Sequence, residues 1–595
     1  MGKSLTSAKT GDRFRFAMKR IHAGTAVLLA ACASSVFAQC PVNDATPPAT
    51  PLTYPKTSDR YAVQYRIGSG AWTNAQVYIS DYGATDGSPY RQDSGYSLET
   101  SMSFVSIPAS SKANVQMRVT KLFDTPFQPG DHVSARPSVK PILVDRQPDG
   151  TALISTETGA NFDGEQFILW WNRGTDSAAV ESLAFFLDPP YTPPVPGNNV
   201  LTVHSQADLN GDLSSYNTLN FEGYVVIGPA GATAFSVPGN IYTIFLGPNS
   251  WVQGKLRFGD PDDASQPRQI YGPGVLDVSR FDYESRACPG DQGYYALSSS
   301  HTPNALLNDF SIDGIVITDM NHAANDILFN STVNNVKVLG WNGENAALRL
   351  GDHTSASNLF VRSGDDSLMM WGTYVTINNA TVWQNYNGGV VNLGWSDNSH
   401  GDYGMIDGLY VVKTDWLTPT ASSWTAIAPA PLPAPQPLQG QNNAVFASLM
   451  VPGTTFGTLK PPTFQNIFVE DPPQVLFSLK ILPPICADTG MSCPSVALTD
   501  NPSELNLNIE NLFSPASIVE NSIGFQTLPA GYTQDGQTIA TTTTLTGSMT
   551  IGMTNVLIEL PEGIWLPLLG FDAAPVGKIG TNGAGVDVNY SLELP

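Results

Sequence analysis

The chain has 595 residues, which is enough for two or more domains or for one long repetitive domain. Glycine (53) and proline (46) are abundant and only 14% of residues are charged, a composition typical of β-structure with many turns rather than of helical bundles. The net charge of −23 disfavours binding to nucleic acid or to an anionic membrane surface.

The first 38 residues predict an export signal. They contain six basic residues and one acidic residue, so the rest of the chain holds 23 basic and 51 acidic residues, a net charge of −28. Lys19 and Arg20 precede the apolar run AVLLAACASSVFA, which ends in a small-residue cleavage site at Ala38 and is too short to span a membrane. We expect a secreted or periplasmic protein. A lipoprotein attached through Cys32 is the alternative, because LAAC resembles a lipoprotein box.

Residues 39–190 are expected to form an N-terminal β-sandwich. Between residues 61 and 187, short runs of alternating apolar side chains (YAVQYRI, AQVYIS, ANVQMRV, FILWW, LAFFL) are separated by Gly, Pro, Asp and Ser turns. This spacing is typical of an antiparallel sandwich. The proline-rich segment DPPYTPPVPGNN, at residues 188–199, then predicts a linker and a domain boundary.

A repeat occupies much of the remaining chain, residues 200–595. In DGIVI, NNVKV, SNLFV, NNATV and DGLYV, two small polar residues precede apolar positions that begin at residues 315, 336, 359, 380 and 409. Asn and Gly in these pairs tolerate left-handed backbone angles at a corner. A second set of apolar pairs runs between these segments, at Ile327/Phe329, Leu348/Leu350, Leu368/Met370 and Val391/Leu393.

Two interleaved strand repeats of some twenty residues indicate a solenoid, in which each turn completes the core of its neighbour. A leucine-rich repeat is the alternative, but its leucine and asparagine spacing is absent. We therefore predict an all-β chain, with a β-sandwich followed by a right-handed parallel β-helix.

Four cysteines remain after cleavage at Ala38, an even number that permits disulfides in an exported protein. Cys486 and Cys493 bracket a short loop and are the expected pair, whereas a bond between Cys40 and Cys288 is a weaker hypothesis. No spacing of Cys and His resembles a zinc site, so we expect neither a metal nor a cofactor.

The candidate catalytic residues Asp365 and Asp366 lie side by side in VRSGDDSLMMWG, at the entry to a predicted strand. Alignment of Leu348 with Leu368 as equivalent strand starts places Ala346 beside Asp366. Two close carboxylates disfavour simultaneous ionisation, and glycosidases need one protonated and one ionised carboxyl group. The alternative is that Asp-Asp is only a turn signal at a corner of the solenoid.

Polar and aromatic side chains of the same turns are candidate substrate-binding groups. Tryptophan faces offer apolar platforms for a sugar ring, although they could equally fill the core. Tryptophans recur here at Trp341, Trp371, Trp383 and Trp395. We expect substrate binding by Arg349, Trp371, Asn387, Asn392 and Trp395.

The segment from residue 361 to residue 395 resembles glycoside hydrolase family 49, the dextranases and isopullulanases. That family has an Asn-Asp-Asp motif entering a strand, then Ala-Thr-x-Trp and a closing Gly-Trp. This chain has Gly364-Asp365-Asp366, Ala380-Thr381-Val382-Trp383 and Gly394-Trp395. The resemblance is clearest over residues 240–412. It implies the same succession of β-sandwich and right-handed β-helix, and hydrolysis of α-glucans with inversion.

The resemblance also implies roles for the two aspartates. Asp365 matches the general acid, and Asp366 matches a base that activates water together with a third aspartate one coil earlier. Here Ala346 occupies the place of that third aspartate, and Met369 that of a family lysine. The carboxylates that could take the third role are Glu344, the nearest, and then Asp352 and Asp326.

These observations predict an exported, inverting endo-glycosidase that acts as a monomer on a neutral polysaccharide. The predicted substrate is dextran-like α-1,6-glucan, with pullulan as a second candidate. A polygalacturonase-like hydrolase is one alternative, although that family's motifs are absent and a charge of −28 opposes a polyanionic substrate. A non-catalytic polysaccharide-binding β-helix is the other, and Ala346 is the feature that favours it.

Overall fold

The computed structural model describes residues 54–81, 101–123, 126–173, 182–228, 234–279, 295–299, 307–320, 323–340, 346–386, 388–396, 400–416, 443–450, 454–473, 475–481 and 503–515, and short strands between residues 522 and 593. The predicted export signal and all four cysteines of the predicted disulfides lie outside these residues. No helix among the described residues is long and apolar enough to cross a membrane.

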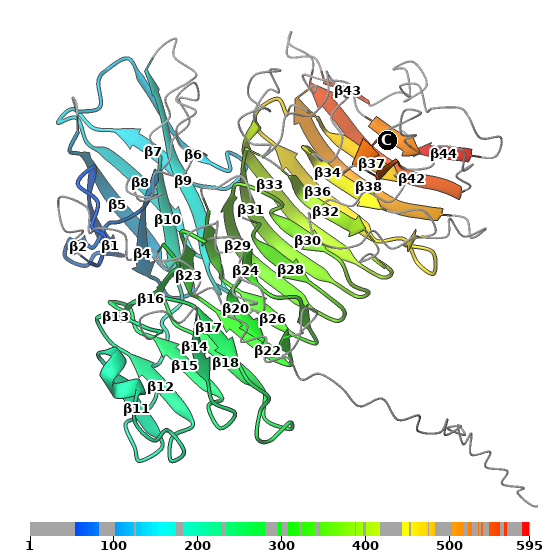
Figure 1. Cartoon of the computed structure of the whole chain (residues 1–595). Coiled ribbons are helices and arrows are strands. Elements are labelled where there is room, and N and C mark those ends of the chain that lie inside the picture. Colours follow the sequence, from blue (N-terminus) through cyan, green and yellow to red (C-terminus); the bar gives the residue numbers. More distant parts are fainter. Residues whose placement is uncertain are drawn as a thin grey trace, which may run out of the picture. The chain divides into compact units, whose positions relative to one another are not determined.

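Two five-stranded sheets form the N-terminal sandwich, drawn in blue and cyan in Figure 1. The first contains, in sheet order, β2 (Thr73–Ala75), β1 (Tyr61–Ile67), β5 (Asn114–Lys121), β8 (Ala152–Glu157) and β7 (Leu143–Arg146). The second contains β3 (Tyr78–Asp81), β4 (Ser101–Pro108), β10 (Leu183–Asp188), β9 (Glu165–Arg173) and β6 (Asp131–Arg136).

The sandwich core lies between these sheets. Val115, Met117 and Val119 of β5 are buried while their neighbours along the strand are more exposed, as predicted from the alternating pattern. On the opposing sheet, the rings of Phe167 and Phe185 stack with centroids 5.0 Å apart. The prediction of a purely antiparallel sandwich is wrong at one pair. β10 lies between β9 and β4. It pairs antiparallel with β9 but parallel with β4.

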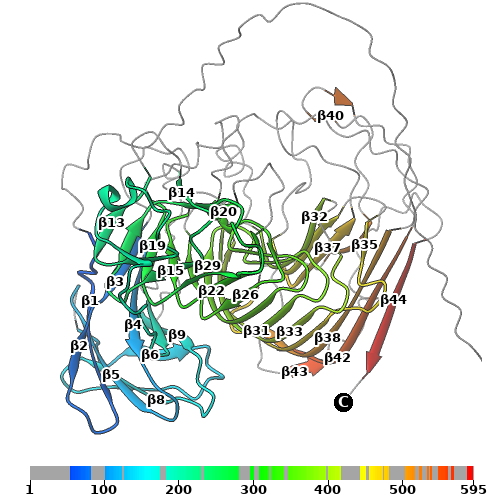
Figure 2. The same cartoon turned by 90° about the horizontal axis from the view of Figure 1, so that it is seen from below.

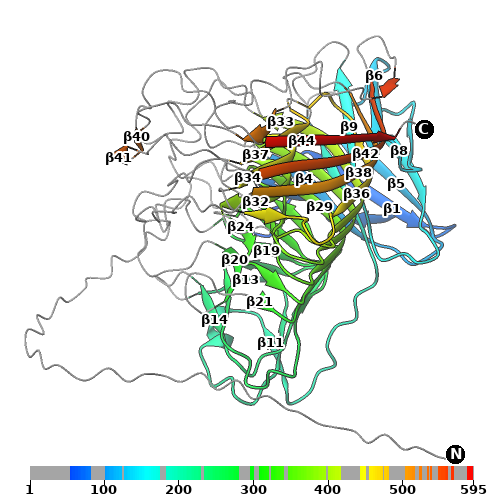
Figure 3. The same ribbon diagram turned by 90° about the vertical axis from the view of Figure 1, so that its right-hand side faces the viewer.

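A solenoid of parallel strands follows the sandwich, drawn from green to red in Figure 1. Its largest sheet contains β11 (Val200–Val203), β12 (Thr218–Phe221), β13 (Tyr224–Val226), β15 (Thr243–Leu246), β16 (Trp251–Gln253), β18 (Arg268–Tyr271), β19 (Val275–Asp277), β22 (Phe310–Asp313), β23 (Val316–Thr318), β26 (Thr332–Asn334), β27 (Lys337–Leu339), β29 (Ser355–Ser363), β31 (Thr376–Tyr386), β33 (Met405–Trp416), β35 (Thr455–Phe456), β36 (Thr463–Val469), β38 (Ser503–Pro515), β42 (Gly547–Glu559), β43 (Trp565–Pro567) and β44 (Val586–Glu593). Every pairing in it is parallel except that of β42 with β43, and Figures 2 and 3 show its later strands as neighbouring arrows.

Two smaller parallel sheets close the solenoid. One contains β14 (Phe235–Val237), β17 (Leu256–Phe258), β20 (Tyr295–Ser299) and β24 (Ala323–Asn325). The other contains β21 (Leu307–Asn308), β25 (Leu328–Phe329), β28 (Leu348–Leu350), β30 (Leu368–Met370), β32 (Gly389–Ser396), β34 (Ala444–Met450), β37 (Phe477–Ile481) and β39 (Ser522–Phe525). A short 3-10 helix (Gln206–Leu209) and a hairpin of β40 (Thr533–Gln534) with β41 (Gln537–Thr538) complete the elements. The predicted fold class, a β-sandwich followed by a parallel β-helix, is confirmed.

The second residue of each predicted polar pair marks a corner of the solenoid. Asparagine or glycine at these positions has φ between 51° and 83°, the left-handed region. The asparagines also stack: Asn379 Nδ2 donates to Asn358 Oδ1 (2.6 Å), and Asn555 Nδ2 to Asn511 Oδ1 (2.8 Å). The corner residues are Gly314, Asn335, Asn358, Asn379 and Gly408 of the predicted pairs, followed in later coils by Asn466, Asn511 and Asn555.

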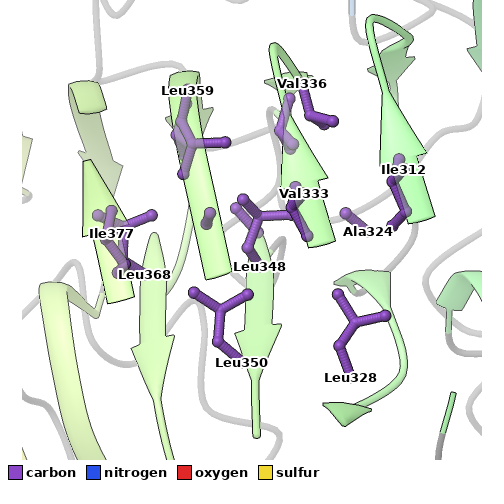
Figure 4. Packing of buried hydrophobic residues seen from close by; sticks show 14 of the residues in the cluster. Ile312, Ala324, Leu328, Val333, Val336, Leu348, Leu350, Leu359, Leu368 and Ile377 are labelled. Atoms are coloured by element: carbon purple, nitrogen blue, oxygen red, sulfur yellow. The ribbon is translucent and has the colours of Figure 1, made fainter. Parts of the chain in front are cut away.

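The predicted apolar positions meet inside the coils, a coil being one turn of the solenoid. Leu348 pairs with Leu368 and Leu368 with Val391, and side chains of the facing sheets point toward one another in Figure 4. The predicted pair Ile327/Phe329 is wrong by one residue. Leu328 is the buried member and pairs with Leu350, because the corner at residue 326 shifts the register.

Apolar side chains on the outside of the solenoid pack against the second sandwich sheet. Trp383 lies 5.5 Å from Trp170 and Phe360 lies 5.2 Å from Phe186, measured between ring centroids. An ion pair between Lys337 and Asp188, both buried, lies in the same interface. Strands β29 and β31 therefore bury apolar side chains on both faces, one toward the solenoid core and one toward the sandwich.

Candidate active site

The aspartate pair forms the corner between β29 and β30. The carbonyl oxygen of Asp366 accepts a hydrogen bond from the N–H of Ala347 (2.8 Å), which continues the ladder of the preceding coil. With Leu348 opposite Leu368, this register places Ala346 beside Asp366, as the sequence alignment predicts. Ala346, which occupies the position of the family's third aspartate, therefore lies beside this corner on the preceding coil.

Two donors hold the side chain of Asp366. Its Oδ1 accepts the N–H of Gly389 (2.7 Å) and its Oδ2 accepts Asn392 Nδ2 (2.5 Å). The Asn392 amide is itself oriented, because its Oδ1 accepts Trp371 Nε1 (3.2 Å) and the N–H of Gly394 (2.9 Å). Only an ionised carboxylate accepts at both oxygens without offering a proton, so this arrangement favours the charged form.

Asp365 is more exposed than Asp366, which is 8% exposed. Asp365 Oδ1 accepts the N–H of Asp366 (2.9 Å), and its carbonyl accepts Ser363 Oγ (2.8 Å) and Gln384 Nε2 (2.8 Å). A β-carbon on Gly388 would lie 2.5 Å from Asp365 Oδ1, so the next coil packs closely over the corner. The backbone of the pair is thus fixed on several sides, and the two carboxyl groups have different environments.

Arg349 projects from the adjacent coil on the same outward face. Its guanidinium lies 4.9 Å from the ring centroid of Tyr295 and 4.8 Å from that of Trp371, and it bonds to the Tyr295 hydroxyl. It also forms an ion pair with Asp326, with Nη1 and Oδ1 3.8 Å apart. Burial raises the pKa of Asp326 from 3.8 to about 6, and Arg349 opposes that rise.

A small apolar floor lies among these polar groups. Ala323, Ala346 and Met369 are buried together, with the rings of Tyr295 and Trp371 packed against them. Ala323 pairs with Ala346, and Arg349 pairs with Met369, so the floor extends over successive coils. Ala346 therefore has a methyl group where the family pattern has an aspartate, and Met369 has a thioether where that pattern has a lysine.

The structure brings together five of the predicted site residues, Asp365, Asp366, Arg349, Trp371 and Asn392, by the contacts above. Glu344 and Asn387 lie outside the described residues, as does Trp341. Trp395 belongs to β32, but its side chain is also outside them.

Two other predicted candidates have structural roles. Trp383 is buried between Trp170 and Arg362, so it fills the interface with the sandwich and offers no sugar platform. Asp352 accepts the N–H of Thr373 (2.7 Å) at a corner. Tyr295 was not predicted, because its chain segment has no repeat signal and only the fold places it beside Arg349.

Comparisons with known proteins agree with the resemblance. No protein-family model matches the chain. Dextranases of Arthrobacter sp. (strain CB-8) and Arthrobacter globiformis are each 25% identical to it over 193 residues. The chain resembles the dextranases. The matched region makes up 30% of this chain and 29% of each dextranase.

The fold of this dextranase-like chain has a solved counterpart. Dex49A from Penicillium minioluteum superposes with a TM-score of 0.62 at 15% sequence identity, over 90% of this chain and 94% of that one. At that identity the superposition supports the fold alone. The resemblance to glycoside hydrolase family 49 predicted from the sequence is confirmed by the dextranase matches together with this shared fold.

Proposed function

We propose that the protein is an exported glycoside hydrolase that cleaves α-glucan, with dextran-like α-1,6 bonds as the first candidate and pullulan as the second. The similarity to two dextranases supports the substrate class. The observation that carries the catalytic proposal is the difference between the two aspartates, since one is held by two donors and the other is more exposed. The predicted signal at residues 1–38 supports export.

In this proposal Asp365 is the general acid. Its proton passes to the glycosidic oxygen as the bond from that oxygen to the anomeric carbon breaks. Asp366 stays ionised and orients a water on the opposite face of the sugar. Attack from that face inverts the anomeric configuration, so an α-linked glucan releases a β-configured reducing end. Arg349 and Trp371 bind the sugar through hydrogen bonds and ring stacking.

The test is release of reducing sugar from dextran and from pullulan by the purified protein. We expect release by the wild type, and none above background by Asp365→Asn, whose amide cannot donate the acid proton. Asp263→Asn is the matched control, because the Asp263 carboxylate accepts from Ser265 and Gln266 in an exposed turn away from the aspartate pair. Full activity of Asp365→Asn, or no release from either polymer, would contradict the proposal.

A second candidate function is polysaccharide binding without cleavage. The apolar floor favours it, because Ala346 and Met369 put a methyl and a thioether group where the family has an aspartate and a lysine. Sedimentation of the protein with insoluble glucan, together with product analysis of the same mixture, separates the two functions. Retention on the polymer with no product after prolonged incubation would support binding alone.

A further inference from the structure

Asp326 is a carboxylate that the predicted roles of the pair leave unused. It forms the corner between β24 and β25, and its side chain is 11% exposed. Its Oδ1 accepts the N–H of Ile327 (2.9 Å) and lies 3.8 Å from Arg349 Nη1. Burial of an ionisable carboxyl group costs stability, and such groups concentrate at functional sites.

A chain of contacts connects Asp326 with the aspartate pair. Asp326 pairs with Arg349, whose guanidinium lies over the ring of Trp371. Trp371 donates to Asn392, and Asn392 donates to Asp366. All five side chains therefore belong to one outward-facing surface, which the described coils from β24 to β32 build.

The strand register gives the spacing between Asp326 and the aspartate pair along the solenoid axis. Ala323 pairs with Ala346, and Leu348 with Leu368, so Asp326 lies two coils before Asp366. Two steps between parallel strands amount to about 10 Å along the solenoid axis. Inverting glycosidases hold the general acid and the general base roughly 6.5–9.5 Å apart to admit a water, so the pair to compare is Asp326 with Asp365, the neighbour of Asp366. Among the described residues of the coil between them, Ala346 contributes a methyl group beside Asp366 and Arg349 contacts Asp326.

We propose that Asp326 is the general base of the reaction and takes the role that Ala346 cannot. This inference rests on the proposed hydrolase function. A water held between Asp326 and Asp366 attacks the anomeric carbon while its proton moves to Asp326. The bond from that carbon to the glycosidic oxygen breaks, and the departing oxygen receives the proton of Asp365. One water is consumed, and each carboxyl group is restored by exchange with solvent.

Asp326 suits proton transfer better than Asp366 does. Both oxygens of Asp366 accept hydrogen bonds, one of them from a side-chain amide, Asn392, whereas the Asp326 carboxylate accepts from the backbone of Ile327 and Ser299 and lies beside the Arg349 cation. That leaves Asp366 suited to orient the water. Arg349 is the charged group that the described residues place against Asp326, and it opposes the rise in pKa that burial causes. Arg349 is in this respect a positioning residue.

Three variants test the proposal with dextran as substrate. Asp326→Asn should lower kcat by about 100-fold or more with little change in KM, since a general base contributes that much. Asp326→Ala should recover turnover in added azide, because azide attacks without a base, and the product should be a glycosyl azide detectable by mass spectrometry. Arg349→Met should move the acidic limb of the pH profile of kcat to higher pH, because the cation that favours ionised Asp326 is lost.

Asp313→Asn is the matched control, because Asp313 is also a partly buried acid whose pKa burial raises, but it bonds to Tyr191 and Asn334 away from this surface. We expect it to keep wild-type kcat. If the wild type cleaves dextran and Asp365→Asn does not, but Asp326→Asn retains activity, Asp326 is not the base and the hydrolase proposal stands. If azide gives no glycosyl azide with Asp326→Ala, the role of Asp326 is structural. If the wild type cleaves nothing, both proposals fail.

Discussion

Replacement of Asp326 by asparagine is expected to stabilise the fold at neutral pH. Burial raises the pKa of this carboxyl group from 3.8 to about 6, despite the opposing Arg349. The native state therefore keeps the proton up to about pH 6, whereas the unfolded chain releases it near pH 4. The free energy of unfolding falls as pH rises through this window, because ionisation is easier in the unfolded chain.

The size of the effect follows from the pKa. A rise of about two pKa units, at about 1.4 kcal/mol each, corresponds to about 3 kcal/mol of lost stability above pH 6. The neutral amide of the Asp326→Asn variant would resemble the protonated acid and escape this loss. We expect urea unfolding, followed by tryptophan fluorescence, to show Asp326→Asn more stable than wild type by about 3 kcal/mol at pH 7.5, and nearly equal to it at pH 4. Equal stability at pH 7.5, or the same difference at both pH values, would refute the reasoning.

Two further predictions concern the interface between the sandwich and the solenoid, and the corner that holds the aspartate pair. Lys337→Met should lower the free energy of unfolding by about 3–5 kcal/mol, because it leaves Asp188 buried without its cation, and the double variant with Asp188→Asn should recover part of the loss in the same denaturation assay. A full loss in the double variant would argue against the ion pair. Gly388→Ala should abolish release of reducing sugar, because φ is +73° there and the new β-carbon would lie 2.3 Å from the Asp366 nitrogen. Gly211→Ala, where a β-carbon meets nothing within 4 Å, should behave as wild type, and activity in both variants would show that the corner tolerates the change.

The repeat could be predicted because its physical cause is local. A left-handed corner admits Asn or Gly, and the alternation after it sets which side chains face inward, so positions such as Asn358 and Leu359 follow from the sequence. The outer face of the same strands could not be predicted. Phe360 and Trp383 are apolar because the sandwich covers them, and a strand buried on both faces carries no sign of which partner lies on which side.

The candidate site was predictable only in part, because some of its residues are neighbours in the sequence and others meet only in the folded chain. Asp365 and Asp366 are adjacent in sequence and match a family motif, so they were found together. Asp326 was one of several candidate carboxylates, and its place depends on a corner that shifts the register by one residue and on Arg349 in the next coil. Tyr295 comes from a different sheet and meets Arg349 only in the folded chain.

The most direct test of the hydrolase account is proton NMR of dextran during the first minutes of digestion, before the released reducing ends mutarotate. The account predicts that β-configured reducing ends appear first with the wild type and that none appear with Asp365→Asn. Initial release of α-configured ends, or equal release by the Asp365→Asn variant, would contradict it.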